Sequence, residues 1–174
     1  MNAPDRIFAT APADPAAVLR RYYRGHARLY DATRWSFLFG RAALIRALAL
    51  LPTPPRNILE IGCGTGSNLV RLVRQFPEAA VTGLDLSADM LARARRKLER
   101  DQLLATLLQQ RYDRPLYPEP VFDLIVFSYC LTMINPGWER AVEAALRDLR
   151  PGGRLAVVDF HDTPFAGFRR WMGV

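Results

Sequence analysis

The stretch NILEIGCGTG, residues 57–66, decides the fold of this chain. Its first five residues are mostly apolar around one acid, Glu60, and predict a short buried strand. Three glycines follow at alternate positions: Gly62, Gly64 and Gly66. Glycine allows a tight turn and lets backbone N–H groups approach a ligand without a clash at Cβ. Because a helix is predicted directly afterwards, over 68–76, the stretch indicates a cofactor-binding turn between a strand and a helix.

The chain beyond this turn alternates predicted strands and helices. The strands are expected over 57–63, 80–86, 103–109, 122–129 and 154–160, and the helices over 68–76, after the capping residue Ser87, and over 141–149. The leucines of 103–109 also suit a helix. Alternation of this kind predicts an α/β fold: a Rossmann-like, doubly wound parallel sheet of five strands with helices on both faces.

Two amphipathic helices are predicted before the sheet, over 16–35 and 37–51, and the prolines after them end the second helix. We therefore expect a flexible leader over 1–15, an N-terminal helical lid or membrane-facing segment over 16–56 and a ligand-binding domain over 57–174. Residues 1–56 hold nine Arg against three Asp, which accounts for +6 of the net charge of +7. A basic front end indicates a local anionic partner rather than a nucleic acid along the whole chain.

Composition excludes several classes of protein. The 174 residues are 50% hydrophobic and 24% charged, which suits one globular domain and neither a disordered nor a fibrous chain. Two cysteines exclude a disulfide scaffold and fit a reducing compartment, so we expect a cytoplasmic protein. Cys63 and Cys130 are expected to be buried as small apolar side chains. The two histidines, His26 and His161, are too far apart in sequence to predict a metal site.

The glycine spacing and one aspartate distinguish between cofactors. A dinucleotide fingerprint G-x-G-x-x-G would need glycine at position 67, where the chain has Ser67. Asp85 ends the second predicted strand, 19 residues after Gly66, where a carboxylate can accept both hydroxyls of an adenosine ribose.

Together, E-x-G-x-G-x-G over 60–66, G-L-D-L-S-x-x-M-L over 83–91 and LRPGG over 149–153 resemble the class I S-adenosylmethionine-dependent methyltransferases. The resemblance covers about residues 57–162 and implies S-adenosylmethionine as the cofactor. It implies these roles: Glu60 near the methionine end, Gly62, Gly64 and Gly66 along the cofactor, Asp85 on the ribose, and Leu86 and Met90 beside the adenine. Asp113 is a weaker candidate for the adenine amine. Ser128, Tyr129 and Thr132, at a strand's carboxyl end, are expected near the transferred methyl group.

A narrower resemblance concerns the methyl acceptor. Residues 22–41 and 128–134 (SYCLTMI) are similar to bacterial betaine-lipid N-methyltransferases, which trimethylate the amine of a diacylglyceryl-homoserine lipid. It implies a lipid or small-molecule amine as acceptor. Independently, the basic, amphipathic N-terminal segment with Trp35, Phe37 and Phe39 indicates peripheral contact with an anionic membrane, although a buried helix with a solvated basic face explains this segment equally well. An ammonium substrate must lose a proton, to solvent or through Tyr129 or His161, and Tyr30 belongs to the aromatic surface of the predicted lid.

Other interpretations of the sequence remain open. The family's sheet normally ends in an antiparallel strand pair, and about a dozen residues after Asp162 leave no room for it, so we expect a truncated chain or a sheet edge covered by a second copy. Methylation of a quinone or soluble amine and a non-catalytic S-adenosylmethionine-binding module are the alternatives. Ser67 and the absence of Tyr-x-x-x-Lys disfavour an NAD-dependent oxidoreductase. Nucleic-acid methylation lacks its Asn/Asp-Pro-Pro-aromatic motif, since Ser128-Tyr129-Cys130-Leu131 stands there.

Overall fold

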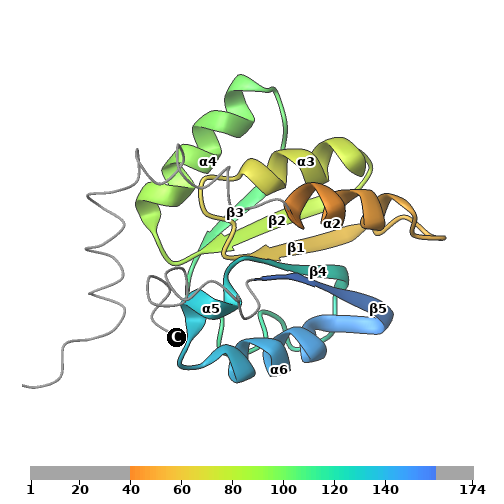
Figure 1. Cartoon of the computed structure of the whole chain (residues 1–174), viewed down its shortest axis with the longest axis vertical. Coiled ribbons are helices and arrows are strands. Elements are labelled where there is room, and N and C mark those ends of the chain that lie inside the picture. The colour runs from red at the N-terminus through yellow and green to blue at the C-terminus, as the bar shows by residue number, and fades with distance from the viewer. Residues whose placement is uncertain (1–39, 160–174) are drawn as a thin grey trace, which may run out of the picture.

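A computed structural model describes residues 40–159 of the chain, and within them a parallel sheet carries the fold (Figure 1). Its five strands lie in the order β3-β2-β1-β4-β5. Their bounds are β1 Asn57–Ile61, β2 Ala80–Asp85, β3 Thr106–Gln109, β4 Phe122–Ser128 and β5 Leu149–Val158. Every neighbouring pair is parallel, which confirms the predicted Rossmann-like α/β fold.

Helices cover both faces of the sheet. Figure 1 shows α2 (Gly40–Ala49), α3 (Ser67–Gln75) and α4 (Ala88–Arg100) on one face, and α6 (Trp138–Asp148) with the short α5 (Leu131–Ile134) on the other. The helix predicted over 37–51 is α2, although residues 37–39 lie outside the described part. Leu48 of α2 is buried in the same apolar cluster as Leu69 and Leu72 of α3. The described part of the predicted lid segment, residues 40–56, thus packs on the sheet through α2.

Alternating side chains of the strands divide the core into two layers. In β1, Ile58 packs with the α2–α3 layer, whereas Leu59 and Ile61 pack with the alanines of α6. The side chain of Glu60 therefore points to the α3 side of the sheet, because successive residues of a strand face opposite sides. This alternation brings the only acid of β1 under the start of α3.

Several predicted boundaries were wrong. The last strand begins at Leu149 rather than 154, because Leu149 pairs with Phe122 and a register shift precedes the pairing of Arg154 with Leu124. Residues 150–153 form the resulting irregularity, and their proline and glycines hid the strand from the sequence pattern. The helix before it begins at Trp138 rather than 141, α5 was not expected, and β3 is limited to 106–109, a strand and not a helix.

A buried carboxylate fixes the connection between β3 and β4. Asp148, fully buried at the end of α6, accepts a hydrogen bond from the Tyr112 hydroxyl at 2.7 Å. It also accepts from the Leu116 backbone N–H at 3.0 Å. Burial, with the bond to Asp148, raises the pKa of Tyr112, so the phenol stays neutral. One side chain thereby ties an irregular loop to the helix beneath it.

We expect Asp148→Ala to lower the free energy of unfolding by about 2 kcal/mol, because it leaves the buried Tyr112 hydroxyl and the partly buried Leu116 N–H without their acceptor. Tyr112→Phe removes one of these donors together with its bond and should cost only about 1 kcal/mol. Urea unfolding followed by circular dichroism measures both variants. Equal stability of Asp148→Ala and the wild type would contradict the anchoring role.

A second carboxylate makes stability depend on pH. Asp123 accepts hydrogen bonds from the Arg56 and Asn57 backbone N–H groups at 2.8 and 2.9 Å and from Arg150 at 3.2 Å. Burial opposes the charge of Asp123, but these donors outweigh burial and hold the pKa of the carboxyl below its usual range. The stabilisation is therefore complete above the unfolded-state pKa, about 4, and disappears as the pH falls through the folded-state pKa.

Asp123→Asn should therefore lower stability at pH 7, and this loss should shrink progressively as the pH falls below about 4 and the wild-type carboxyl takes up its proton. Urea unfolding of both proteins at pH 7 and over an acidic pH series measures the difference. A stability gap that does not narrow on acidification would refute the assignment of this ionised group.

Candidate functional site

The glycine turn lies where the winding of the sheet reverses. The chain moves outward from β1 to β2 and β3, and then returns to place β4 on the other side of β1. A crevice beyond the carboxyl ends of two such strands is where open α/β sheets bind ligands. The residues that follow β1 and β4 therefore lie close to Asp85, which ends β2, at the carboxyl-terminal edge of the sheet.

The three glycines of the turn differ in what surrounds them, although all have positive φ. A Cβ added at Gly62 would lie 2.6 Å from the Cβ of Cys130, and one at Gly66 would lie 2.8 Å from the Cβ of Ala94. A Cβ at Gly64, at φ +54°, would meet no atom within 4 Å in the described structure. Gly62 and Gly66 thus allow close packing of the turn, and Gly64 faces the space open to a ligand.

Asp85 reaches this turn directly. Its Oδ2 atom accepts a hydrogen bond from the Gly64 backbone N–H at 2.8 Å, and its Oδ1 atom accepts from the Ser87 N–H at 2.9 Å. A carboxylate offers about four acceptor positions, so two backbone bonds are compatible with the ribose-binding role predicted from the sequence. The structure brings the predicted ribose-binding carboxylate and the predicted cofactor turn into contact.

Glu60 has a partner that the sequence analysis did not single out. Asn68, in the first turn of α3, donates a hydrogen bond from Nδ2 to Glu60 Oε1 at 3.0 Å, and both residues are 1% exposed. The Oδ1 atom of Asn68 is buried and has no hydrogen-bond partner among the described residues. A buried polar atom of this kind is costly, and such groups concentrate at functional sites. The sequence signal for this partner was the polar Asn68, two positions after Gly66, at the start of the predicted helix.

Tyr129 and Ser128 end β4 beside α2. Tyr129 has φ +55°, a strained value for a residue other than glycine, and its buried hydroxyl accepts a hydrogen bond from the Gly40 N–H at 3.0 Å. Arg41 donates from Nε to Ser128 Oγ at 3.3 Å, and its guanidinium lies 6.0 Å from the centre of the Tyr129 ring. The structure therefore joins the predicted reaction-side residues to the first turn of α2, and adds Arg41 to them.

Asp159 follows β5 and organises the same edge. Its Oδ2 atom accepts from the Leu131 N–H at 2.7 Å, and its Oδ1 atom accepts from Thr132 Oγ1 at 2.9 Å. Thr132, expected near the methyl group, is thus an exposed residue held at the start of α5. An acid directly after an apolar strand, as at Asp85, was a signal for Asp159 that the sequence analysis missed.

The remaining predicted residues are placed as follows. Met90 is 2% exposed, and its N–H donates to the helix cap Ser87, at 3.4 Å from Oγ. Leu86 is half-buried beside the cap. Asp113 lies after β3 and pairs with Arg111 at 3.1 Å. Tyr30 and His161 lie outside the described residues.

Comparison with known proteins identifies the family. The family model described as a methyltransferase domain matches residues 58–153, which include the glycine turn, Asp85 and the whole of β4. The chain belongs to this methyltransferase family.

Two curated relatives extend the comparison. The chain is 38% identical over 111 residues to a trans-aconitate 2-methyltransferase of Methylobacterium nodulans, covering 63% of this chain and 41% of the relative. It is 35% identical over 147 residues to a demethylmenaquinone methyltransferase of Tropheryma whipplei, covering 83% of this chain and 59% of the relative. The chain thus spans about half the length of the curated relatives it matches.

Solved structures agree on the fold and the cofactor. A structure described as a DhpI-SAM-HEP complex matches with a TM-score of 0.67 and 26% identity over 94% of this chain and 72% of that one. The sugar N-methyltransferase KedS8 from Streptoalloteichus matches with a TM-score of 0.56 and 26% identity over 92% of this chain and 59% of that one. These likenesses and the family support S-adenosylmethionine as the methyl donor.

The residues of the glycine turn and its neighbours fit this cofactor. Gly64 leaves space for a ligand, and the adjacent Asp85 carboxylate can accept hydrogen bonds from hydroxyls. The hydrogen-bonded Glu60–Asn68 pair adds buried polar groups beside the turn. Burial raises the pKa of both Cys63 and Cys130, so neither thiol is poised for nucleophilic chemistry. Among residues 40–159, no group of three or more metal-ligating side chains gathers. In the same range, none of the helices has the length and apolar character that crossing a bilayer requires.

Proposed function

We propose that this protein transfers a methyl group from S-adenosylmethionine to an amine of a small or lipid acceptor. The observation that carries the proposal is the 2.8 Å bond from Gly64 N to Asp85 Oδ2, which brings the glycine turn and the ribose-binding carboxylate together at the point where the sheet reverses. When bound, S-adenosylmethionine supplies an electrophilic methyl group on its sulfonium.

The chain's own residues mainly position the reactants. Asp85 holds the ribose, Glu60 lies at the methionine end and Met90 provides an apolar wall for the adenine. The acceptor lies over the carboxyl ends of β4 and β5, near Ser128 and Tyr129. Alignment of an amine lone pair with the methyl group, with water excluded, supplies much of the rate in such a displacement. An ammonium acceptor loses its proton to solvent or through Tyr129 or His161.

We propose an amino-lipid headgroup as the acceptor. The support is the similarity of residues 128–134 and 22–41 to betaine-lipid N-methyltransferases, and the match to a sugar N-methyltransferase, which acts on an amine. The basic arginines of residues 1–56 would attract an anionic membrane surface from the cytoplasmic side. The two curated relatives are named for methyl acceptors of other kinds, trans-aconitate and demethylmenaquinone. A quinone or another small molecule is therefore the second candidate.

The test is a methyl-transfer assay of the full chain with labelled S-adenosylmethionine. The acceptors are diacylglyceryl-homoserine in anionic vesicles, the soluble amine homoserine, trans-aconitate and demethylmenaquinone. Label in the amino lipid alone, with co-flotation of the protein with the vesicles, is the expected result. Label in the quinone or in trans-aconitate without flotation would select the second candidate. Cofactor binding without transfer to any acceptor would indicate a non-catalytic binding module.

Oligomerisation belongs to the same proposal. Val157 of β5 is 47% exposed, and β5 forms one edge of the sheet in the described residues. Exposed apolar edges of sheets are normally covered in natural proteins. A second copy of the chain on this edge would make the protein a dimer, which sedimentation velocity of the full chain measures.

A further inference from the structure

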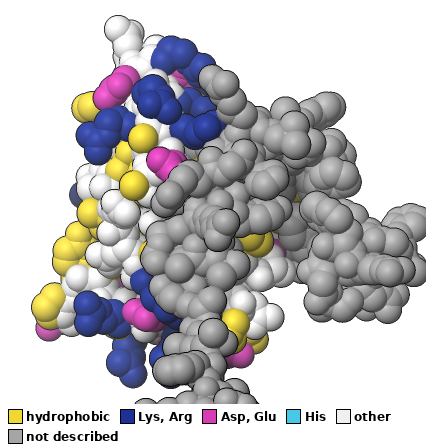
Figure 2. All heavy atoms as spheres, turned by 90° about the vertical axis from the view of Figure 1, so that its left-hand side faces the viewer, with side chains coloured by type: hydrophobic (Ala, Val, Ile, Leu, Met, Phe, Trp, Pro, Cys, Tyr) yellow, Lys and Arg dark blue, Asp and Glu magenta, His cyan; other side chains and the backbone are white. Residues whose placement is uncertain are grey.

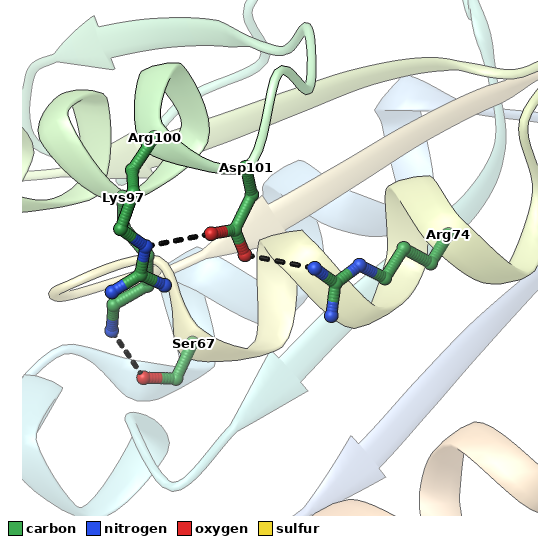
Figure 3. Close-up of polar contacts among 5 residues, drawn as sticks. All are labelled: Ser67, Arg74, Lys97, Arg100 and Asp101. Atoms are coloured by element: carbon green, nitrogen blue, oxygen red, sulfur yellow. Dashed lines mark hydrogen bonds and ion pairs between the residues drawn. The ribbon is translucent and has the colours of Figure 1, made fainter.

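The only lysine of the chain, Lys97, contacts the cofactor turn. Its ammonium donates to Ser67 Oγ at 2.7 Å (Figure 3). It also donates to Thr65 Oγ1 at 3.5 Å, so it bonds both residues that flank Gly66. The basic residues Arg93, Arg96, Lys97 and Arg100 predict a solvated face of this helix, α4, but Lys97 is half-buried. Its neighbours Arg96 and Arg100 are exposed, and basic side chains gather over this end of the molecule in Figure 2.

The same face of α4 already touches the turn through its apolar surface. Ala94, one helical turn before Lys97, is fully buried and occupies the space that a Cβ at Gly66 would need. Residues three apart on a helix lie on one face. Ala94 therefore sets how closely α4 approaches Gly66, and Lys97 adds polar bonds to the two residues flanking it.

Stabilisation of α3 alone does not account for this lysine. Gly66 precedes α3 as its N-cap and provides no side-chain cap, and the first turn of α3 holds no acid. A cation near the N-terminus of a helix is unfavourable to the helix dipole. The contact is therefore better explained by the shape of the turn than by the helix that follows it.

We propose that Lys97 is a positioning residue for the cofactor turn: it contributes to S-adenosylmethionine affinity without touching the cofactor. Through Thr65 and Ser67 it restrains the backbone on both sides of Gly66, and thereby the position of Gly64, which faces the ligand space. The inference rests on cofactor binding at this turn and is independent of the identity of the methyl acceptor.

A second tie between the same helices provides a matched control. Arg74, in the last turn of α3, bonds Asp101 at the end of α4 at 2.9 Å, and Asp101 also bonds Arg100 at 2.7 Å (Figure 3). The Lys97–Ser67 and Arg74–Asp101 contacts both join α3 to α4, but the second lies at the opposite end of α3 from the turn. Arg74→Met removes a contact between the helices and leaves the turn in place.

The experiment measures the Kd of S-adenosylmethionine by calorimetry and the melting temperature for the full chain and four variants: Lys97→Met, Ser67→Ala, the double variant and Arg74→Met. We expect Lys97→Met to raise Kd about fivefold to tenfold, since charged hydrogen bonds are among the stronger ones. Ser67→Ala should raise Kd about threefold. The double variant should resemble Lys97→Met, because the two side chains form one interaction. Arg74→Met should leave Kd within about twofold of the wild type.

The outcomes separate the alternatives. Lys97→Met with wild-type Kd and a lowered melting temperature would make Lys97 merely structural and overturn the proposal. Effects of Lys97→Met and Ser67→Ala that simply add would also overturn it. If Lys97→Met does not fold, Ser67→Ala decides alone, and an unchanged Kd refutes the proposal. A wild-type chain that fails to bind S-adenosylmethionine would instead refute the cofactor assignment itself.

Discussion

Asp85→Ala is expected to weaken S-adenosylmethionine binding by about 100-fold or more. The carboxylate is predicted to accept two ribose hydroxyls, and hydrogen bonds to a charged group contribute about 1.5–3 kcal/mol each, where about 1.4 kcal/mol is tenfold in affinity. The substitution also removes the acceptor of the Gly64 and Ser87 N–H groups, which loosens the turn. Calorimetric titration of the full chain gives the Kd.

Two further variants make this experiment decisive. Asp89→Ala removes an exposed acid from the first turn of α4 and should bind like the wild type. Asp85→Asn keeps one acceptor oxygen and loses the charge, so its affinity should fall between those of the wild type and Asp85→Ala. A Kd for Asp85→Ala within threefold of the wild type would remove Asp85 from the cofactor site.

Gly66→Ala is expected to lower the free energy of unfolding by about 2–5 kcal/mol. An L-residue in the left-handed region costs about 1–2 kcal/mol, and forcing a methyl into a packed site costs about 1–3 kcal/mol. Both costs apply, because Gly66 has φ +75° and an added Cβ would lie 2.8 Å from the Cβ and 3.1 Å from the Cα of Ala94. Urea unfolding of the variant measures the loss.

Gly64→Ala should separate binding from stability. The new methyl meets no described atom within 4 Å, so only the conformational cost of about 1–2 kcal/mol applies to folding. It would project into the space proposed for the cofactor, and the Kd for S-adenosylmethionine should rise at least tenfold. Gly152→Ala is the matched control, because Gly152 has φ +80° and equally open surroundings but belongs to β5. If Gly64→Ala and Gly152→Ala bind the cofactor alike, the open side of Gly64 is not part of the site.

Local sequence patterns were sufficient for the order of the strands. Apolar runs bounded by glycine or proline predicted the strands, and the sequence predicted that Asp85 and the glycine turn belong to one site, in which the structure joins Asp85 to Gly64. The boundaries of β5 were not predictable, because a strand that tolerates Pro151 and Gly152 depends on its pairing with β4 rather than on its own composition.

The contacts that complete the site could not be predicted in the same way. Asn68 contacts Glu60, and Lys97 contacts Ser67, only because helices pack on the sheet at particular rotations. A periodic pattern marks Lys97 as lying on the outer face of α4, but the length of a lysine side chain lets it return to the neighbouring helix. Packing of this kind is a tertiary property, and single-sequence periodicity does not contain it.

The bond between Gly64 and Asp85 has a consequence for the energetics of cofactor capture. The hydrogen bond to Asp85 already holds the turn after β1 against the end of β2 in the free protein. The entropy of ordering the turn is therefore lost during folding and not during binding. The turn is preorganised for the proposed cofactor, so more of the interaction energy should appear as affinity. The amide of Gly64 should accordingly exchange slowly with deuterated solvent before any ligand is added, and the affinity for the cofactor should decline together with the local stability of this segment.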